Sequence, residues 1–257
     1  MRKQRHKPPQ LRLGLVDRIQ LAMSTSRHLD GVWIGTLRGS QDDLSRVEGA
    51  LSLIKQHSPL DYARITGELE RIWVRVTVYG LGEYRHTLKA CILDERYLAD
   101  SATSVERIAS TIVHEATHAR LERYGIEYHE KLRARIEAVC FRREWAFAAR
   151  LSDGASLQQE IAGYLEWYRA NPDQFSDAQF RENHMIGGIE ALRHLGAPNW
   201  LARVMPIQKS MIDRVRRLSP IAAWAISVPF VIVFGLCCAF AAFLDPKAYS
   251  KGKSPQE

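Results

Sequence analysis

Residues 103–125 read TSVERIASTIVHEATHARLERYG, and this stretch decides the fold. Its apolar residues recur at steps of three and four, which places them on one face of an α-helix. They are Ile108, Ala109, Ile112, Val113 and Ala116. Thr103 and Glu106 have the spacing of a capping box, and Gly125 is a typical residue just beyond a helix end. We therefore predict a helix with one buried face that ends near Gly125.

The same stretch carries the motif HExxH at residues 114–118. Residues four apart share a face of a helix, so the imidazoles of His114 and His118 can reach one cation. Glu115 is the next residue after the first histidine, and its carboxylate can accept a hydrogen bond from a water molecule beside that cation. The motif therefore predicts a Zn²⁺ site with a general base next to it.

A third ligand is expected from a separate element. Glu137 follows His118 after 18 intervening residues and lies in a second predicted helix, from about Glu127 to Leu151. Glu144 lies two turns further along the same face, so it is either a competing ligand or a partner that orients a ligand. The alternative for Glu137 is a surface carboxylate that pairs with Arg133 or Arg135.

Over about residues 104–145 the chain resembles the gluzincin metallopeptidases, in which a glutamate follows HExxH by a similar gap. The resemblance implies that His114, His118 and Glu137 hold zinc and that Glu115 is the general base and proton shuttle of peptide-bond hydrolysis. The chain lacks the third histidine of the metzincins and the GxMxN segment of the aminopeptidases, so a small, divergent zincin is expected.

The resemblance has two further implications for the site. The strand around His86–Leu93 borders the cleft and can pair with an extended peptide. A tyrosine or histidine elsewhere stabilises the oxyanion. The candidates for that donor are Tyr97, Tyr164, His184 and His194.

The residues before the motif show the alternation of strands. Arg71–Tyr79 alternates apolar and polar residues, as a half-buried strand does, and Tyr84–Leu93 reads as the returning strand after a glycine-rich turn. These two stretches predict a hairpin. Another strand is expected at Val32–Leu37, followed by a helix that Asp42 or Asp43 caps and that stops before Pro59.

Helices are also expected at 158–170 and 177–195, with Pro172 and Gly196 as breaks. Strands followed by helices predict an α+β fold. Its expected form is zincin-like, with a small antiparallel sheet, an active-site helix and a helical C-terminal part.

Residues 221–244 (IAAWAISVPFVIVFGLCCAFAAFL) carry no charge over 24 positions. A helix of this length spans about 36 Å, which exceeds the hydrocarbon core of about 30 Å. We predict one transmembrane helix here. The remaining divisions are a flexible basic arm at 1–10, the metallopeptidase domain at 11–197, an amphipathic juxtamembrane segment at 198–219 and a short tail at 245–257.

The charges indicate an orientation and a partner. Residues 201–220 carry five basic residues and the C-terminal flank of the span carries three, which favours a cytoplasmic catalytic domain. The N-terminus does not read as a secretory signal peptide. The net charge is +7, and without a recognisable nucleic-acid motif the basic clusters favour membrane lipid over nucleic acid.

The four cysteines show no CxxC spacing outside the apolar segment, which is typical of a reducing compartment and predicts no disulfide framework. The leading hypothesis is a membrane-anchored zinc endopeptidase that acts on peptides or proteins. Two alternatives remain: a non-catalytic membrane-associated binding or regulatory protein with a structural zinc site, and a membrane adaptor or toxin-like effector in which HExxH is accidental.

Overall fold

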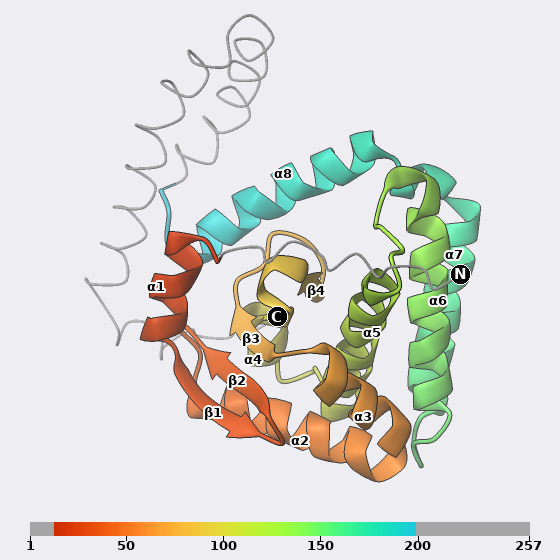
Figure 1. Cartoon of the computed structure of the whole chain (residues 1–257). Coiled ribbons are helices and arrows are strands. Elements are labelled where there is room, and N and C mark those ends of the chain that lie inside the picture. Colours follow the sequence, from red (N-terminus) through yellow and green to blue (C-terminus); the bar gives the residue numbers. More distant parts are fainter. Residues whose placement is uncertain (1–12, 199–257) are drawn as a thin grey trace, which may run out of the picture. The chain divides into compact units, whose positions relative to one another are not determined.

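The computed structural model describes residues 13–198 (Figure 1). The helices are α1 Leu15–Met23, α2 Gln41–His57, α3 Pro59–Glu68, α4 Glu95–Ala99, α5 Val105–Arg123, α6 Glu130–Ala148, α7 Ala155–Ala170 and α8 Asp177–His194, with 3-10 turns η1 His86–Leu88 and η2 Pro172–Phe175. The strands are β1 Thr25–Leu29, β2 Val32–Thr36, β3 Arg71–Arg75, β4 Gly82–Arg85 and β5 Ala90–Asp94. The chain separates into two compact units, of which the first ends at Arg181 and the second begins at Glu182.

The predicted HExxH helix is confirmed as α5, although its cap differs by one position. Ser104 is the N-cap and accepts a hydrogen bond from the Arg107 amide at 3.3 Å, so the Thr103–Glu106 capping box is wrong. At the other end Gly125 has a φ of 80°, which costs glycine little because it has no Cβ. Its amide and that of Ile126 donate to Glu122 and Leu121 at 2.7 and 3.1 Å, and these bonds end the helix.

The first long helix, α2, is also confirmed with a different cap. Ser40 is the N-cap rather than Asp42 or Asp43, and Asp43 is the acidic member of a capping box with it. The Ser40 amide donates to the Asp43 carboxylate at 2.6 Å, and the Asp43 amide donates to the Ser40 hydroxyl at 3.2 Å. A serine two positions upstream of Asp42 therefore satisfies the free amides at this helix end.

The strands form one five-stranded sheet with the order β1-β2-β3-β5-β4. The two outer pairs, β1 with β2 and β4 with β5, are antiparallel, whereas β2 with β3 and β3 with β5 are parallel. The predicted α+β fold with a small antiparallel, zincin-like sheet is therefore wrong. The described residues are mostly helical, and their sheet is mixed.

The predicted hairpin fails because β3 is not half-buried. Trp73 is as fully buried as Ile72 and Val74 on the opposite side, and a strand covered on both faces belongs to the middle of a sheet. The stretch predicted as one returning strand, Tyr84–Leu93, is split by η1 and by Lys89, which has a φ of 43°. Consequently β4 forms the hairpin with β5, while β3 pairs with β5 in parallel.

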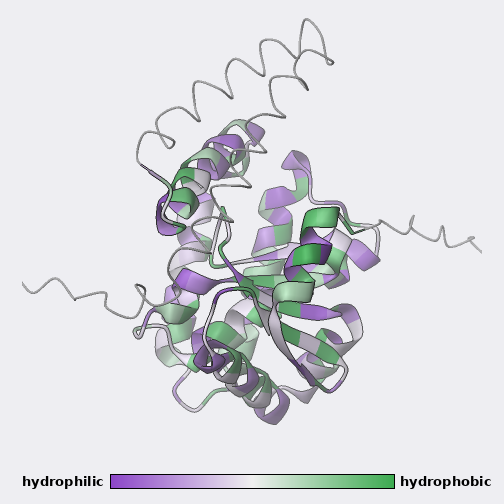
Figure 2. Cartoon of the chain, turned by 90° about the vertical axis from the view of Figure 1, so that its left-hand side faces the viewer, coloured by the Kyte–Doolittle hydropathy of each residue, from purple (hydrophilic) through white to green (hydrophobic). Residues whose placement is uncertain are grey.

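The two faces of the sheet pack against different elements. One face joins α2, α3 and α5 in the main hydrophobic core, to which Ile34, Ile72 and Leu93 contribute. The other face carries a smaller cluster around Trp73, against which Leu21 of α1 packs. Hydrophobic and hydrophilic residues alternate along the helices in Figure 2, as expected for helices with one buried side.

The segment at 221–244 and its flanking segments lie outside the described residues. Within residues 13–198, no helix combines the length and the apolar character that a membrane crossing requires. The transmembrane helix and the cytoplasmic placement therefore stay predictions of the sequence.

The buried face of α5 gives a test of this packing. Ile112 is 0% exposed in the main core, so Ile112→Ala should leave a cavity and lower the free energy of unfolding by about 2–5 kcal/mol. Val139→Ala on α6, where the side chain is 39% exposed, is the control and should change it by no more than about 0.5 kcal/mol. Urea denaturation of both variants measures the difference, and equal losses would contradict the packing.

Candidate metal centre

The candidate site lies between α5 and α6, which follow one another in the chain and run side by side (Figure 1). Glu137, Cys140 and Glu144 are spaced by three and four residues, so they share one face of α6. That face meets the face of α5 that carries the two histidines. The short connection after Gly125 lets the chain reverse between the two helices.

The three predicted ligands converge. The Nε2 atoms of His114 and His118 are 3.0 Å apart. A carboxylate oxygen of Glu137 lies 3.2 Å from the His114 nitrogen, and the other oxygen lies 3.5 Å from the His118 nitrogen. A tetrahedral ion about 2.1 Å from each ligand needs ligand atoms about 3.4 Å apart, so these separations are close to those of a zinc site.

Glu144 does not lie on the side of His114 that would face the cation, so it does not compete with Glu137 as a ligand. Its carboxylate bonds the Nδ1 atom of His114, on the opposite side of the ring from Nε2, and accepts a hydrogen bond from Ser110 Oγ at 2.8 Å. Glu144 and Ser110 are 8% and 1% exposed. A carboxylate that receives Nδ1–H fixes the tautomer with its lone pair on Nε2 and makes that nitrogen a better ligand. Glu144 therefore orients His114.

Glu137 is held in place by a tyrosine that the sequence did not single out. The Tyr128 hydroxyl donates to a carboxylate oxygen of Glu137 at 2.6 Å, and its ring lies edge-on to His118 with centroids 5.5 Å apart. Tyr128 lies in the connection between the two helices, where no periodic pattern marks it. Its position makes it a residue that orients the third ligand.

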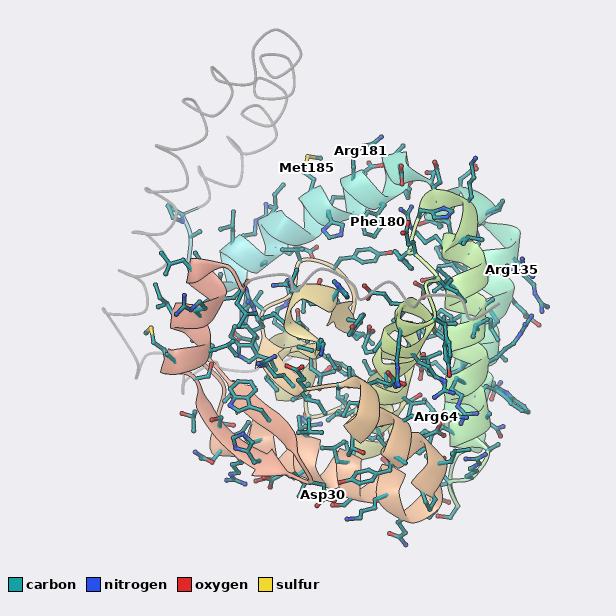
Figure 3. The ribbon with its side chains drawn as sticks, in the orientation of Figure 1. Asp30, Arg64, Arg135, Phe180, Arg181 and Met185 are labelled. Atoms are coloured by element: carbon teal, nitrogen blue, oxygen red, sulfur yellow. The ribbon has the colours of Figure 1, made fainter. Side chains whose placement is uncertain are left out.

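The alternative partners of Glu137 are engaged elsewhere or point away. Arg133 donates to Asp177 at 2.8 Å and to the Phe175 carbonyl, and its guanidinium lies over the Phe180 ring, 4.6 Å from the centroid. Arg135 is exposed and points outward from α6 in Figure 3. The surface ion pair weighed for Glu137 is therefore not formed in the structure.

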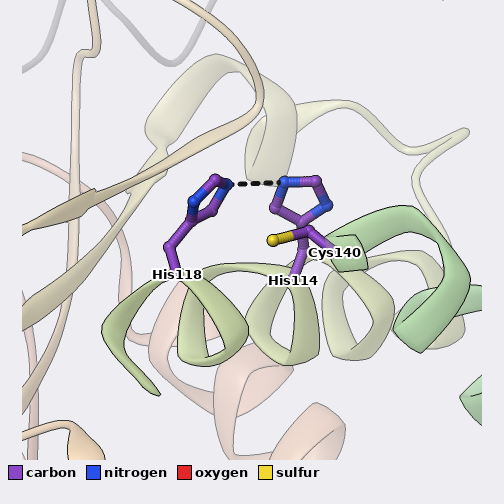
Figure 4. A group of neighbouring side chains, drawn as sticks. All are labelled: His114, His118 and Cys140. Atoms are coloured by element: carbon purple, nitrogen blue, oxygen red, sulfur yellow. Dashed lines mark hydrogen bonds between the residues drawn. The ribbon is translucent and has the colours of Figure 1, made fainter. Parts of the chain in front are cut away.

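A fourth donor, Cys140, also reaches this place. Its sulfur and the histidine nitrogens all lie within 4.8 Å of one another. In Figure 4 the sulfur extends from α6 toward the space between the two rings. A cysteine without a CxxC partner gives no metal signal in a sequence by itself, so Cys140 was not expected here. The signal that could have found it is its spacing of three from Glu137, which places both residues on one helix face.

Glu115 lies on the side of α5 that faces the sheet edge. It is 5% exposed, and a Cβ added to Gly82 of β4 would stand 3.2 Å from its Oε1 atom. A glycine suits this close approach, because a Cβ here would press on Thr111 and on the Glu115 side chain. Burial raises the pKa of Glu115, and the two histidines oppose that rise. A carboxylate in this state is a stronger base than one in water.

The charges of the cluster are strongly coupled. Burial lowers the pKa of His114, but Glu144 and the other negative groups around it outweigh burial and raise the pKa well above its usual value. His118 responds in the same way to Cys140 and Glu137, and its pKa is raised to about 10. Burial raises the pKa of Glu137, yet its bonds to both histidines hold that pKa well below the usual range. The negative groups around the two imidazoles therefore favour positive charge at this place.

Two of the four oxyanion candidates, Tyr97 and Tyr164, have hydroxyl partners other than the metal-ligand candidates. Tyr97 is buried, with its hydroxyl 3.3 Å from the Thr111 hydroxyl, and the Tyr164 hydroxyl donates to Glu160 at 3.3 Å. His184 and His194 belong to the second compact unit. The strand predicted to border the cleft is also corrected, because β5 is an inner strand and β4 is the edge.

The residues present fit a zinc ion. Two imidazoles and a carboxylate from two helices point their donor atoms at one place, and a buried carboxylate stands behind one imidazole. This donor set is one that zinc prefers, although other first-row cations accept it as well. Compared with protein-family models, curated proteins and solved structures, the chain gave no match in any of the three.

The role of Glu144 can be tested by its effect on affinity. Glu144→Gln removes the charge behind His114 and should weaken zinc binding about 10- to 100-fold. Glu166→Gln, at an exposed position on α7, is the control and should bind like the parent protein. Competition with a chromogenic chelator measures both. Unchanged affinity in Glu144→Gln would remove the orienting role.

The coupled charges also predict a pH dependence. A cation must displace the protons that His114 and His118 hold in the metal-free protein, so affinity rises as those protons are lost. Because the pKa of His118 is raised from 6.5 to about 10, the increase should continue through neutral pH toward about pH 10. Chelator competition over this range measures it. A plateau just above 6.5, the usual imidazole pKa, would contradict the coupling.

Proposed function

We propose that this chain is a zinc-dependent metallopeptidase. The observation that carries the proposal is the approach of a Glu137 carboxylate to within 3.2 and 3.5 Å of the two nitrogens of an HExxH pair, from a different helix. If HExxH were only part of a solvent-exposed helix surface, no carboxylate from a second helix would be expected between its two histidines. The contacts of Glu144 with His114 and of Tyr128 with Glu137 also support the proposal. Histidines that meet by chance are not expected to have partners that fix the orientation of the ligands.

Each residue has a distinct part in the proposed reaction. His114, His118 and Glu137 hold the cation, and when bound, zinc polarises the scissile carbonyl and lowers the pKa of a water molecule. Glu115 takes a proton from the attacking water at its carboxylate and passes it to the leaving amine. Its burial beside Gly82 keeps solvent away and its raised pKa suits both transfers.

The proposed substrate is an extended peptide. Among the described strands β4 lies at one edge of the sheet, and a Cβ added to its Gly82 would stand 2.9 Å from Thr111 Cγ2 and 3.2 Å from Glu115 Oε1 on α5. A peptide that adds to this edge as a further strand would pass beside the general base. Attachment to a membrane through residues 221–244, with the catalytic part in the cytoplasm, remains part of the proposal on sequence grounds.

One observation favours a second candidate, a structural zinc site without catalysis. Cys140 brings a fourth protein donor close to the two histidines, and four protein ligands are typical of structural zinc. Such a protein would bind zinc in the same stoichiometric amount as a peptidase but would hydrolyse no peptide. Turnover therefore separates the two candidates.

The proposed mechanism depends on Glu115. Glu115→Gln keeps the shape of the side chain but removes the base, so peptide hydrolysis should fall about 100- to 10,000-fold while zinc content stays the same. Cleavage of a fluorescence-quenched peptide library and metal analysis measure the two quantities. Glu106→Gln, in the first turn of the same helix, is the matched control and should keep full activity. Full turnover by Glu115→Gln would end the mechanism.

A further inference from the structure

Cys140 is the donor that the proposed reaction leaves unused. It is fully buried and has a free thiol. Its sulfur forms one group with ring nitrogens of His114 and His118, all within 4.8 Å of one another. The sulfur therefore lies close to the two imidazoles that the Glu137 carboxylate also approaches, and Figure 4 draws the sulfur beside the two rings.

The second free cysteine of the described residues, Cys91, differs from Cys140 in its surroundings. Cys91 of β5 is equally buried, but it belongs to the main hydrophobic core, and burial raises the pKa of its thiol well above the ordinary value. Cys140 lies outside that core cluster and close to two imidazoles, one helical turn along α6 from Glu137. A buried cysteine that only filled space would be expected among apolar side chains, as Cys91 is.

The geometry needs little adjustment to include the sulfur. A thiolate binds zinc at about 2.3 Å, so a sulfur and a nitrogen on one tetrahedral ion are about 3.6 Å apart. The observed group, within 4.8 Å, is about one ångström wider. Glu137 and Cys140 come from the same face of α6, so both can approach the ion without a change in the helix.

We propose that Cys140 is a fourth protein ligand of the metal centre and that its sulfur holds the peptidase site closed at rest. The closing of a peptidase site rests on the proposed function, whereas the binding of the metal by Cys140 does not. On binding, the S–H bond breaks, its proton goes to solvent and the sulfur donates an electron pair to the cation, with no change in oxidation state. On opening, the sulfur regains a proton and the fourth position is released for the reaction.

The test uses the full chain loaded with Co²⁺ in place of zinc. A cobalt–thiolate bond gives an intense charge-transfer band in the near ultraviolet, which nitrogen and oxygen ligands do not give. We expect the band in the parent protein, its loss in Cys140→Ser with cobalt still bound, and its retention in the control Cys91→Ala. Zinc affinity should fall about tenfold or more in Cys140→Ser, as is usual when a metal site loses a supporting contact.

A second protein keeps the test independent of how Cys140→Ser folds. Replacing Cys91 by alanine and Cys237 and Cys238 by serine leaves Cys140 as the sole thiol of the chain. The charge-transfer band should persist in this protein. Its absence there, with cobalt bound in equal amount, overturns the ligation.

Activity separates this inference from the proposed function. If the sulfur occupies the fourth position nine-tenths of the time, Cys140→Ser should hydrolyse peptides about tenfold faster than the parent. A cobalt–thiolate band without turnover in either protein supports the ligation and overturns the peptidase. Turnover in the parent without the band, and with no gain in Cys140→Ser, supports the peptidase and overturns the role of Cys140.

Discussion

A series of hydrogen-bonded polar and charged side chains between α5 and α6 determines the geometry of the candidate centre. Ser110 donates to Glu144, Glu144 bonds His114, His114 meets Glu137, and Tyr128 donates to Glu137. A charge removed from water costs several kcal/mol unless it is paired and hydrogen-bonded. Ser110 and His114 belong to α5, whereas the carboxylates they bond, Glu144 and Glu137, belong to α6. A slide of α6 by one residue would separate them, so the pairing fixes the register in which the two helices pack.

The same pairing prepares the cluster for a cation. Burial lowers the pKa of His114 and His118, but the negative groups around them outweigh burial and raise it, so this place favours positive charge. A divalent ion brings positive charge to the same place and displaces protons from the imidazoles. The ion would meet Glu137 on the Nε2 side of His114, while Glu144 keeps its bond to Nδ1 of the same ring.

The helix that carries the motif connects the core with the site. Ile108 and Ile112 of α5 are buried against the sheet, while His114 and His118 project toward α6 and Glu115 faces the edge strand. Because the apolar side of α5 is held by the main core, the direction of its polar side chains is held as well. The absence of a side chain at Gly82 then decides how near the sheet edge comes to the carboxylate.

The sequence by itself determined the elements whose signal is local. The period of apolar residues located α5, HExxH placed two imidazoles on one face, and the gap to Glu137 selected a ligand that the fold does bring within 3.5 Å. Helix spacing is a property of consecutive residues, so it can be read without knowing the fold. The caps were displaced by one or a few positions because several neighbouring polar residues can bond the same amides.

Only the tertiary structure decided the pairing of the strands and the full set of donors. Alternation in Arg71–Tyr79 could not reveal that Trp73 is covered on the second face of the sheet, where Leu21 of α1 packs. An inner parallel strand therefore looked like half of a hairpin. Cys140 and Tyr128 are likewise silent in the sequence. Their roles come from contacts between segments brought together by packing, and the chain's own spacing does not encode which distant side chain a residue will meet.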